Sequence, residues 1–141
     1  MLNYHKSFSL IEIIFAIVIM AVITSIALPK LFSTSNESSF IKLRSDIATI
    51  QNGITNYRKN SIMKNLPQTL ENLDEDNIKL FSNILERPII ATKEYPFWSK
   101  EDDYSYIFHF NSKNELEFIY NPTHLTFLCD TKNTLCQKVI E

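Results

Sequence analysis

The most unusual ionisable residue of this sequence is Glu12, because it lies inside a long apolar run from Phe8 to Leu28. As a helix, this run would be about 31 Å long, which matches the hydrocarbon core of a bilayer. A carboxylate at the middle of such a helix costs roughly 2.5–3.5 kcal/mol, and less near the headgroups. Glu12 is therefore a candidate functional group that needs a cationic partner.

A second candidate is the pair Cys129 and Cys136. Their spacing differs from the Cys-x-x-Cys of redox and zinc motifs, and no histidine or third cysteine stands at a zinc-binding spacing, so we expect no metal site here. The pair either forms a disulfide, which would stabilise the loop by roughly 2.5 kcal/mol, or remains as two reduced thiols.

Groups suited to catalysis or to phosphate binding are sparse. His5, His109 and His124 are scattered along the chain, and His109 is expected to point outward from a strand. No nucleophile, base or metal constellation is apparent, so we expect no enzyme. Gly53 is the single glycine, which excludes every Gly-rich phosphate-binding loop.

Three consecutive acids, Glu101, Asp102 and Asp103, could together offer oxygen ligands to calcium. The same residues fit an exposed acidic turn, which is the interpretation that we favour. We therefore expect no cofactor, with calcium as the one candidate.

Two kinds of element must position these residues. Apolar residues recur every three or four positions in a helix expected at about residues 38–64. They are Phe40, Leu43, Ile47, Ile50, Ile54 and Tyr57. Between about residues 104 and 129, apolar and polar residues alternate, which predicts an antiparallel sheet with one aromatic face. The helix stripe is the natural cover for that face, so we expect an α+β fold with a long N-terminal helix on a small C-terminal sheet.

Two further expectations concern local structure. Pro29 lacks an N–H group and clashes with the preceding turn, so a bend or break is expected there, with a frayed stretch over residues 30–36. Residues 78–85 are expected to form a short helix.

Three interpretations of the apolar run compete. Residues 25–27 are similar to the cut site of a secretory signal, but the run exceeds the ~7–15 apolar residues of such signals and contains an acid. A plain membrane anchor explains the length and gives no reason for Glu12. A membrane segment that uses Glu12 in assembly explains both features.

Residues 6–12, KSFSLIE, resemble the processing site of type IV pilins and type II secretion pseudopilins. The resemblance implies cleavage by prepilin peptidase between Ser7 and Phe8, with a methylated amine on Phe8; Ser7 stands where the family usually has glycine. Glu12 is then fifth in the mature chain and Pro29 twenty-second, as in many family members. The amine would pair with Glu12, preferably between neighbouring subunits, and Pro29 would bend the assembly helix. The family also often closes a C-terminal disulfide, which Cys129 and Cys136 could form.

The resemblance implies a prepilin leader at residues 1–7, a transmembrane helix at 8–28 and a pilin-like domain at 29–141. The protein would be a single-pass protein of the bacterial inner membrane, with its C-terminal domain in the periplasm, and would enter an envelope fibre after processing. The implied partners are prepilin peptidase, other pilin or pseudopilin subunits, the inner-membrane assembly platform and, indirectly, the assembly ATPase.

The implied function is that of a structural pseudopilin subunit of a type II secretion or type IV pilus-type machine, serving protein secretion or DNA uptake. The alternatives are a minor pilin that binds DNA for competence and a subunit of a true type IV pilus. After Leu28 the chain carries 13 Lys and Arg residues against 15 Asp and Glu residues, so its charge gives no general support to nucleic-acid binding.

Overall fold

The computed structural model describes the backbone of residues 9–140 and the side chains of residues 9–25 and 37–140. The chain divides into two compact units, one up to Glu37 and one from Ser38 onward. The second unit contains every strand and its own hydrophobic core.

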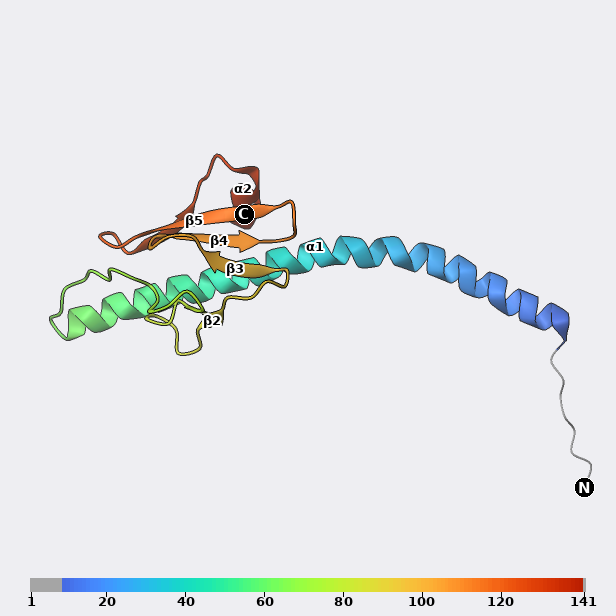
Figure 1. Ribbon diagram of the computed structural model, residues 1–141, viewed down its shortest axis with the longest axis horizontal. Coiled ribbons are helices and arrows are strands. Elements are labelled where there is room, and N and C mark those ends of the chain that lie inside the picture. The colour runs from blue at the N-terminus through green and yellow to red at the C-terminus, as the bar shows by residue number, and fades with distance from the viewer. Residues whose placement is uncertain (1–8, 141) are drawn as a thin grey trace, which may run out of the picture. The chain divides into compact units, whose positions relative to one another are not determined.

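Helix α1 runs from Leu10 to Met63 (Figure 1). The break expected at Pro29 and the frayed stretch over residues 30–36 were wrong, because both lie within this continuous helix. A proline inside a helix removes a single backbone hydrogen bond, and many regular turns on both sides can maintain the helix through it. The helix ends near the predicted residue 64.

The part of α1 before residue 26 exposes its apolar side chains. Exposed fractions range from 49% at Ile14 to 77% at Leu10. Within the part of the chain that the structure describes, no helix is long and apolar enough to cross a membrane. The transmembrane segment at residues 8–28 stays a prediction.

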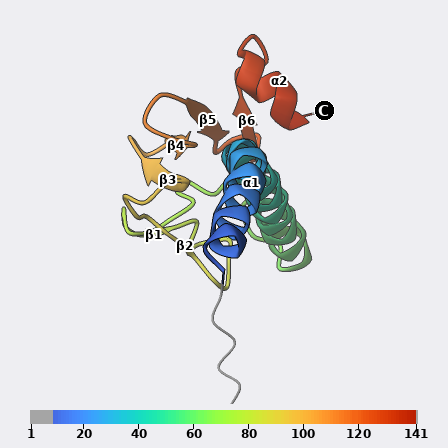
Figure 2. The same cartoon turned by 90° about the vertical axis from the view of Figure 1, so that its right-hand side faces the viewer.

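The C-terminal sheet is an antiparallel meander, with the strand order β3-β4-β5-β6 (Figure 2). Its strands are β3 (Phe97–Lys100), β4 (Ser105–His109), β5 (Glu115–Asn121) and β6 (Thr126–Cys129). The α+β fold is thus confirmed, and the three predicted strands are present. The sheet begins earlier than predicted, at residue 97, because β3 pairs with β4.

A two-stranded sheet lies between α1 and the meander in the sequence, formed by β1 (Lys79–Leu80) and β2 (Ile89–Ile90). The short helix expected at residues 78–85 was wrong. Phe81 has a φ of 62°, which lies outside the right-handed helical region, and its side chain is fully buried. Burial of this aromatic ring therefore holds the backbone in a conformation that ends β1 and reverses the chain.

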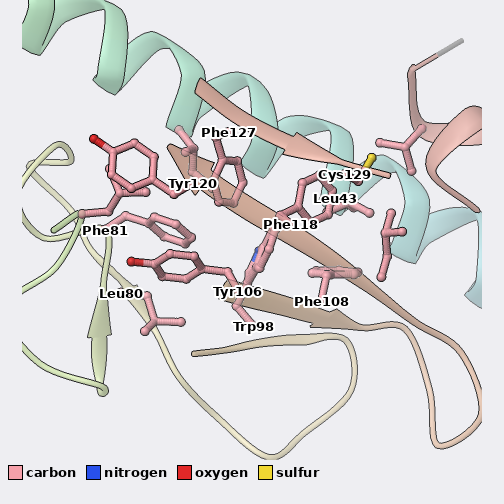
Figure 3. Close-up of a cluster of buried hydrophobic side chains, with 14 of the residues drawn as sticks. Leu43, Leu80, Phe81, Trp98, Tyr106, Phe108, Phe118, Tyr120, Phe127 and Cys129 are labelled. Atoms are coloured by element: carbon pink, nitrogen blue, oxygen red, sulfur yellow. The ribbon is translucent and has the colours of Figure 1, made fainter. Parts of the chain in front are cut away.

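The hydrophobic core lies between α1 and the inner face of the meander (Figure 3). Leu43, Ile50 and Ile54 supply the buried part of the predicted helix stripe. Aromatic rings from the strands meet them, and Phe118 stacks on Phe127 with ring centroids 5.2 Å apart. Such pairs add roughly 0.5–1.5 kcal/mol beyond their buried area.

The chain ends in a short helix, α2 (Thr134–Ile140). A disulfide joins Cys136 of α2 to Cys129 at the end of β6, with their Cα atoms 5.9 Å apart. Arg44 of α1 donates a hydrogen bond to the backbone carbonyl of Lys138. The last helix is thus attached both to the sheet and to α1.

Candidate functional site

The first candidate site is the start of α1, where Glu12 lies in the first helical turn. The backbone N–H of Glu12 donates to the carbonyl of Ser9 at 3.0 Å, and this bond begins the helix. The Glu12 side chain is exposed. Ser7 and Phe8 lie outside the described residues, so the predicted cleavage point and its amine stay predictions, as does the role of Glu12.

Apolar side chains surround Glu12 on every side of the helix. Eleven large ones are exposed within the first four turns: Leu10, Ile11, Ile13, Ile14, Phe15, Ile17, Val18, Ile19, Met20, Val22 and Ile23. They occupy every position from 10 to 23 except Glu12 and two alanines, Ala16 and Ala21, and so form an apolar belt around the helix. A belt of this extent on a single chain marks a surface that contacts lipid or other protein.

The two hydroxyl groups that directly follow the belt are paired within the helix. Thr24 donates from Oγ1 to the carbonyl of Met20 at 2.7 Å, and Ser25 donates from Oγ to the carbonyl of Val22 at 3.0 Å. These bonds remove the need for water at either side chain. Glu12 is then the one ionisable side chain among residues 9–25.

Pro29 lies within α1, beyond the last described side chain of the belt. Its predicted role in bending an assembly helix stays a prediction.

The acidic turn at residues 101–103 is engaged by the protein itself. Asp102 accepts hydrogen bonds from the backbone N–H groups of Tyr104 and Ser105, each at 2.8 Å. Asp103 lies 3.6 Å from the ammonium group of Lys100. No group of three or more histidines, cysteines or acids in the described residues is arranged to hold a metal ion, so the turn gives the calcium candidate no support.

A buried polar network that was not predicted connects the segment after α1 to the sheet. The carboxylate of Asp74 is fully buried and accepts from Lys100 at 2.7 Å and from the Tyr106 hydroxyl at 2.8 Å. The pKa of Tyr106 is raised, mainly by burial of its hydroxyl group and secondly by the hydrogen bond to the Asp74 carboxylate. The pairing of these residues requires β3, which the sequence pattern did not reveal.

The basic residues of α1, which could have formed a nucleic-acid surface, are partly used to hold the domain together. Lys42 pairs with Asp46 at 3.1 Å. Arg58 donates to the carbonyl of His124 at 2.7 Å, and Arg44 binds the end of α2. These contacts favour a structural role for the basic face over an interaction with phosphates.

His109 lies on the outer face of the meander, as expected from the alternation. It was expected to be a plain surface residue, yet its side chain is only 20% exposed and contacts both Ser99 and Glu115. This arrangement could not be predicted from local patterns, because it depends on the register between β3, β4 and β5.

Comparison with known proteins gives one family match. Residues 2–28 match the prokaryotic N-terminal methylation motif. No curated protein and no solved structure matches the chain significantly. This motif is the signal of type IV pilins and pseudopilins, so the resemblance of residues 6–12 to the processing site of that family is confirmed. The match also supports a pilin-like subunit that is processed by prepilin peptidase.

Proposed function

We propose that this protein is a structural pseudopilin-type subunit that assembles through the N-terminal part of α1 into an envelope fibre. The observation that carries the proposal is the apolar belt of residues 10–23 with one acid in its first turn. The methylation motif, which spans the same residues, also supports it. The fibre would serve protein secretion or DNA uptake.

The belt gives the driving force for two successive states of the subunit. Before assembly, its side chains would lie in the inner membrane; after assembly, they would pack against the belts of neighbouring subunits. Removing a large apolar side chain from water contributes roughly 1.5–3 kcal/mol, so eleven of them cannot stay in water. Residues 38–141 would remain in the periplasm.

Glu12 would supply the register of assembly. Cleavage before Phe8 would create a basic amine, and a carboxylate and an ammonium group attract strongly at low dielectric. Breaking such a buried pair by removing one partner leaves an uncompensated charge, which typically costs 3–5 kcal/mol. The incoming amine would therefore stop where it meets the Glu12 of a subunit already in the fibre.

The first experiment tests the processing site. The chain is expressed in membranes with and without prepilin peptidase, and the N-terminus of the product is sequenced. We expect a product that begins at Phe8 only when the peptidase is present. A mature chain that begins at any other residue would refute the proposed cleavage.

The second experiment tests assembly. The Glu12→Ala variant should be cleaved normally but lost from sheared or cross-linked fibres. Glu37→Ala is the matched control, because Glu37 is an exposed acid on the same helix outside the belt, and it should assemble normally. Equal incorporation of both variants would exclude the pairing role of Glu12.

A further inference from the structure

The outer face of the meander brings together a hydroxyl, an imidazole and a carboxylate. Ser99 Oγ lies 2.8 Å from His109 Nε2, and Glu115 Oε2 lies 3.3 Å from His109 Nδ1. Serine is activated for acyl transfer by an imidazole base that has the hydroxyl at one ring nitrogen and a carboxylate at the other. We propose that Ser99, His109 and Glu115 form an acyl-transfer site that accepts small esters.

The register of the sheet explains how these side chains meet. His109 and Glu115 are directly opposite each other on β4 and β5. Phe97 is opposite His109 and Ser99 is opposite Ile107, so Ser99 is a diagonal neighbour of His109 on the same face. The residues between them, Trp98 and Phe108, are fully buried on the inner face and hold the two strands in place.

The imidazole is fixed on several sides. The Phe97 ring stacks on that of His109, with their centroids 4.5 Å apart and their planes inclined by 25°. The Glu115 carboxylate at Nδ1 favours the neutral tautomer that carries its proton there. Nε2 is then free to accept the hydroxyl proton of Ser99.

Ser99 also lines an open hollow of about 770 Å³ between the outer side of β3 and the β1–β2 segment. This volume lies in the range of pockets that bind small molecules. Its lining includes Ile78, Tyr95 and Phe97, which suit an aryl or short alkyl group. Lys93 lines the same hollow and adds a positive charge to its wall.

The chemistry takes place in two balanced steps. Ser99 Oγ bonds to the ester carbonyl carbon while His109 takes the hydroxyl proton; the bond to the leaving oxygen then breaks, and His109 protonates that oxygen to release the alcohol. Water next attacks the acyl-serine and gives a proton to His109. Ser99 regains this proton as the carboxylic acid leaves. Glu115 acts as a positioning residue throughout.

The test uses the full chain in detergent micelles with p-nitrophenyl acetate, and a fluorophosphonate probe followed by peptide mass spectrometry. We expect the probe on Ser99, and ester hydrolysis that falls at least about tenfold in both Ser99→Ala and His109→Gln. Glu115→Gln should lower the rate, and Glu115→Asp should recover part of it, which a purely structural role would not explain.

Ser105→Ala is the matched control. Ser105 lies on the adjacent strand and donates to Glu117 at 2.6 Å, so it has a carboxylate partner without an imidazole. This variant should keep the wild-type rate and the Ser99 label. A wild-type protein that neither hydrolyses the ester nor takes the probe at Ser99 would overturn the proposal, as would full activity in Ser99→Ala. Circular dichroism checks that each variant is folded.

Discussion

Gly53 lies where α1 packs against the segment that follows β1. A Cβ atom added there would stand 2.7 Å from the carbonyl oxygen of Ile84 and 3.0 Å from a methyl carbon of Leu85. The first neighbour is backbone and cannot rotate away. The single glycine of the chain is thus needed for close packing rather than for a special backbone conformation.

Gly53→Ala is therefore expected to destabilise the domain, although alanine favours helix by about 1 kcal/mol. Overpacking against a backbone atom costs about 1–3 kcal/mol, so we expect a net loss of up to about 2 kcal/mol. Urea unfolding followed by circular dichroism measures it. Thr49→Ala, at an exposed position of the same helix, should show no such loss. A more stable Gly53→Ala protein would show that the segment moves aside freely.

Asp74 carries the second residue-scale prediction. Asp74→Asn leaves the ammonium group of Lys100, only 8% exposed, without its close carboxylate. Losing one partner of a buried pair costs about 3–5 kcal/mol, and we expect a destabilisation of that order in urea. Asp103→Asn is the control, since Asp103 is 76% exposed and should contribute at most about 1 kcal/mol. Similar losses in the two variants would contradict the role of the buried pair.

Tyr120 gives a prediction about alkaline pH. Burial raises the pKa of Tyr120 to about 12 from its ordinary value of 10.0, and its hydroxyl donates to the carbonyl of Leu70 at 2.8 Å. The unfolded chain loses the proton more readily, so this contribution to stability is complete below pH 10 and is lost as the pH rises through about 12. Urea unfolding between pH 8 and 12 should show a smaller alkaline loss in Tyr120→Phe. An unchanged slope would contradict the assignment.

At the scale of elements, the short helix α2 depends on the disulfide between Cys129 and Cys136. The bond closes a loop with a sequence separation of 7, for which loop entropy gives about 2.5 kcal/mol. The variant with both cysteines replaced by serine should lose about this much stability in urea. A reducing agent should destabilise the wild type and leave the variant unchanged; a reductant effect on the variant would point to another cause.

The long periodic elements could be predicted from the sequence. The stripe that includes Leu43 and Ile50 recurs over many turns, and alternation along β5 places Leu116 and Phe118 on one face. Both patterns are set by burial against a single partner surface, so local sequence carries them.

Short elements could not be predicted in the same way. The four residues of β3 are too few to show alternation, so neither the Asp74–Lys100 pair nor the Ser99–His109 contact could be anticipated. Apolar spacing over residues 78–85 was typical of a helix, yet burial of Phe81 decided the backbone there. Tertiary contacts overrode local preference at each of these places.

At the scale of the whole molecule, the core draws all its residues from the unit that begins at Ser38. We expect a chain of residues 38–141 to fold alone and to stay in solution without detergent. Its near-ultraviolet circular dichroism and its urea midpoint should match those of the full chain in micelles. Loss of cooperative unfolding in the shorter chain would show that the domain needs residues 9–37.

The oxidation state of the disulfide that attaches α2 also depends on the compartment in which the C-terminal domain lies. Such bonds form and persist in oxidising compartments and are rare in the cytosol. Cells treated with a thiol-alkylating reagent before lysis would therefore carry the label on Cys129 and Cys136 only in copies whose C-terminal domain had never left the cytoplasm. The ratio of alkylated to disulfide-bonded protein on a gel would then measure the ratio of retained to exported molecules.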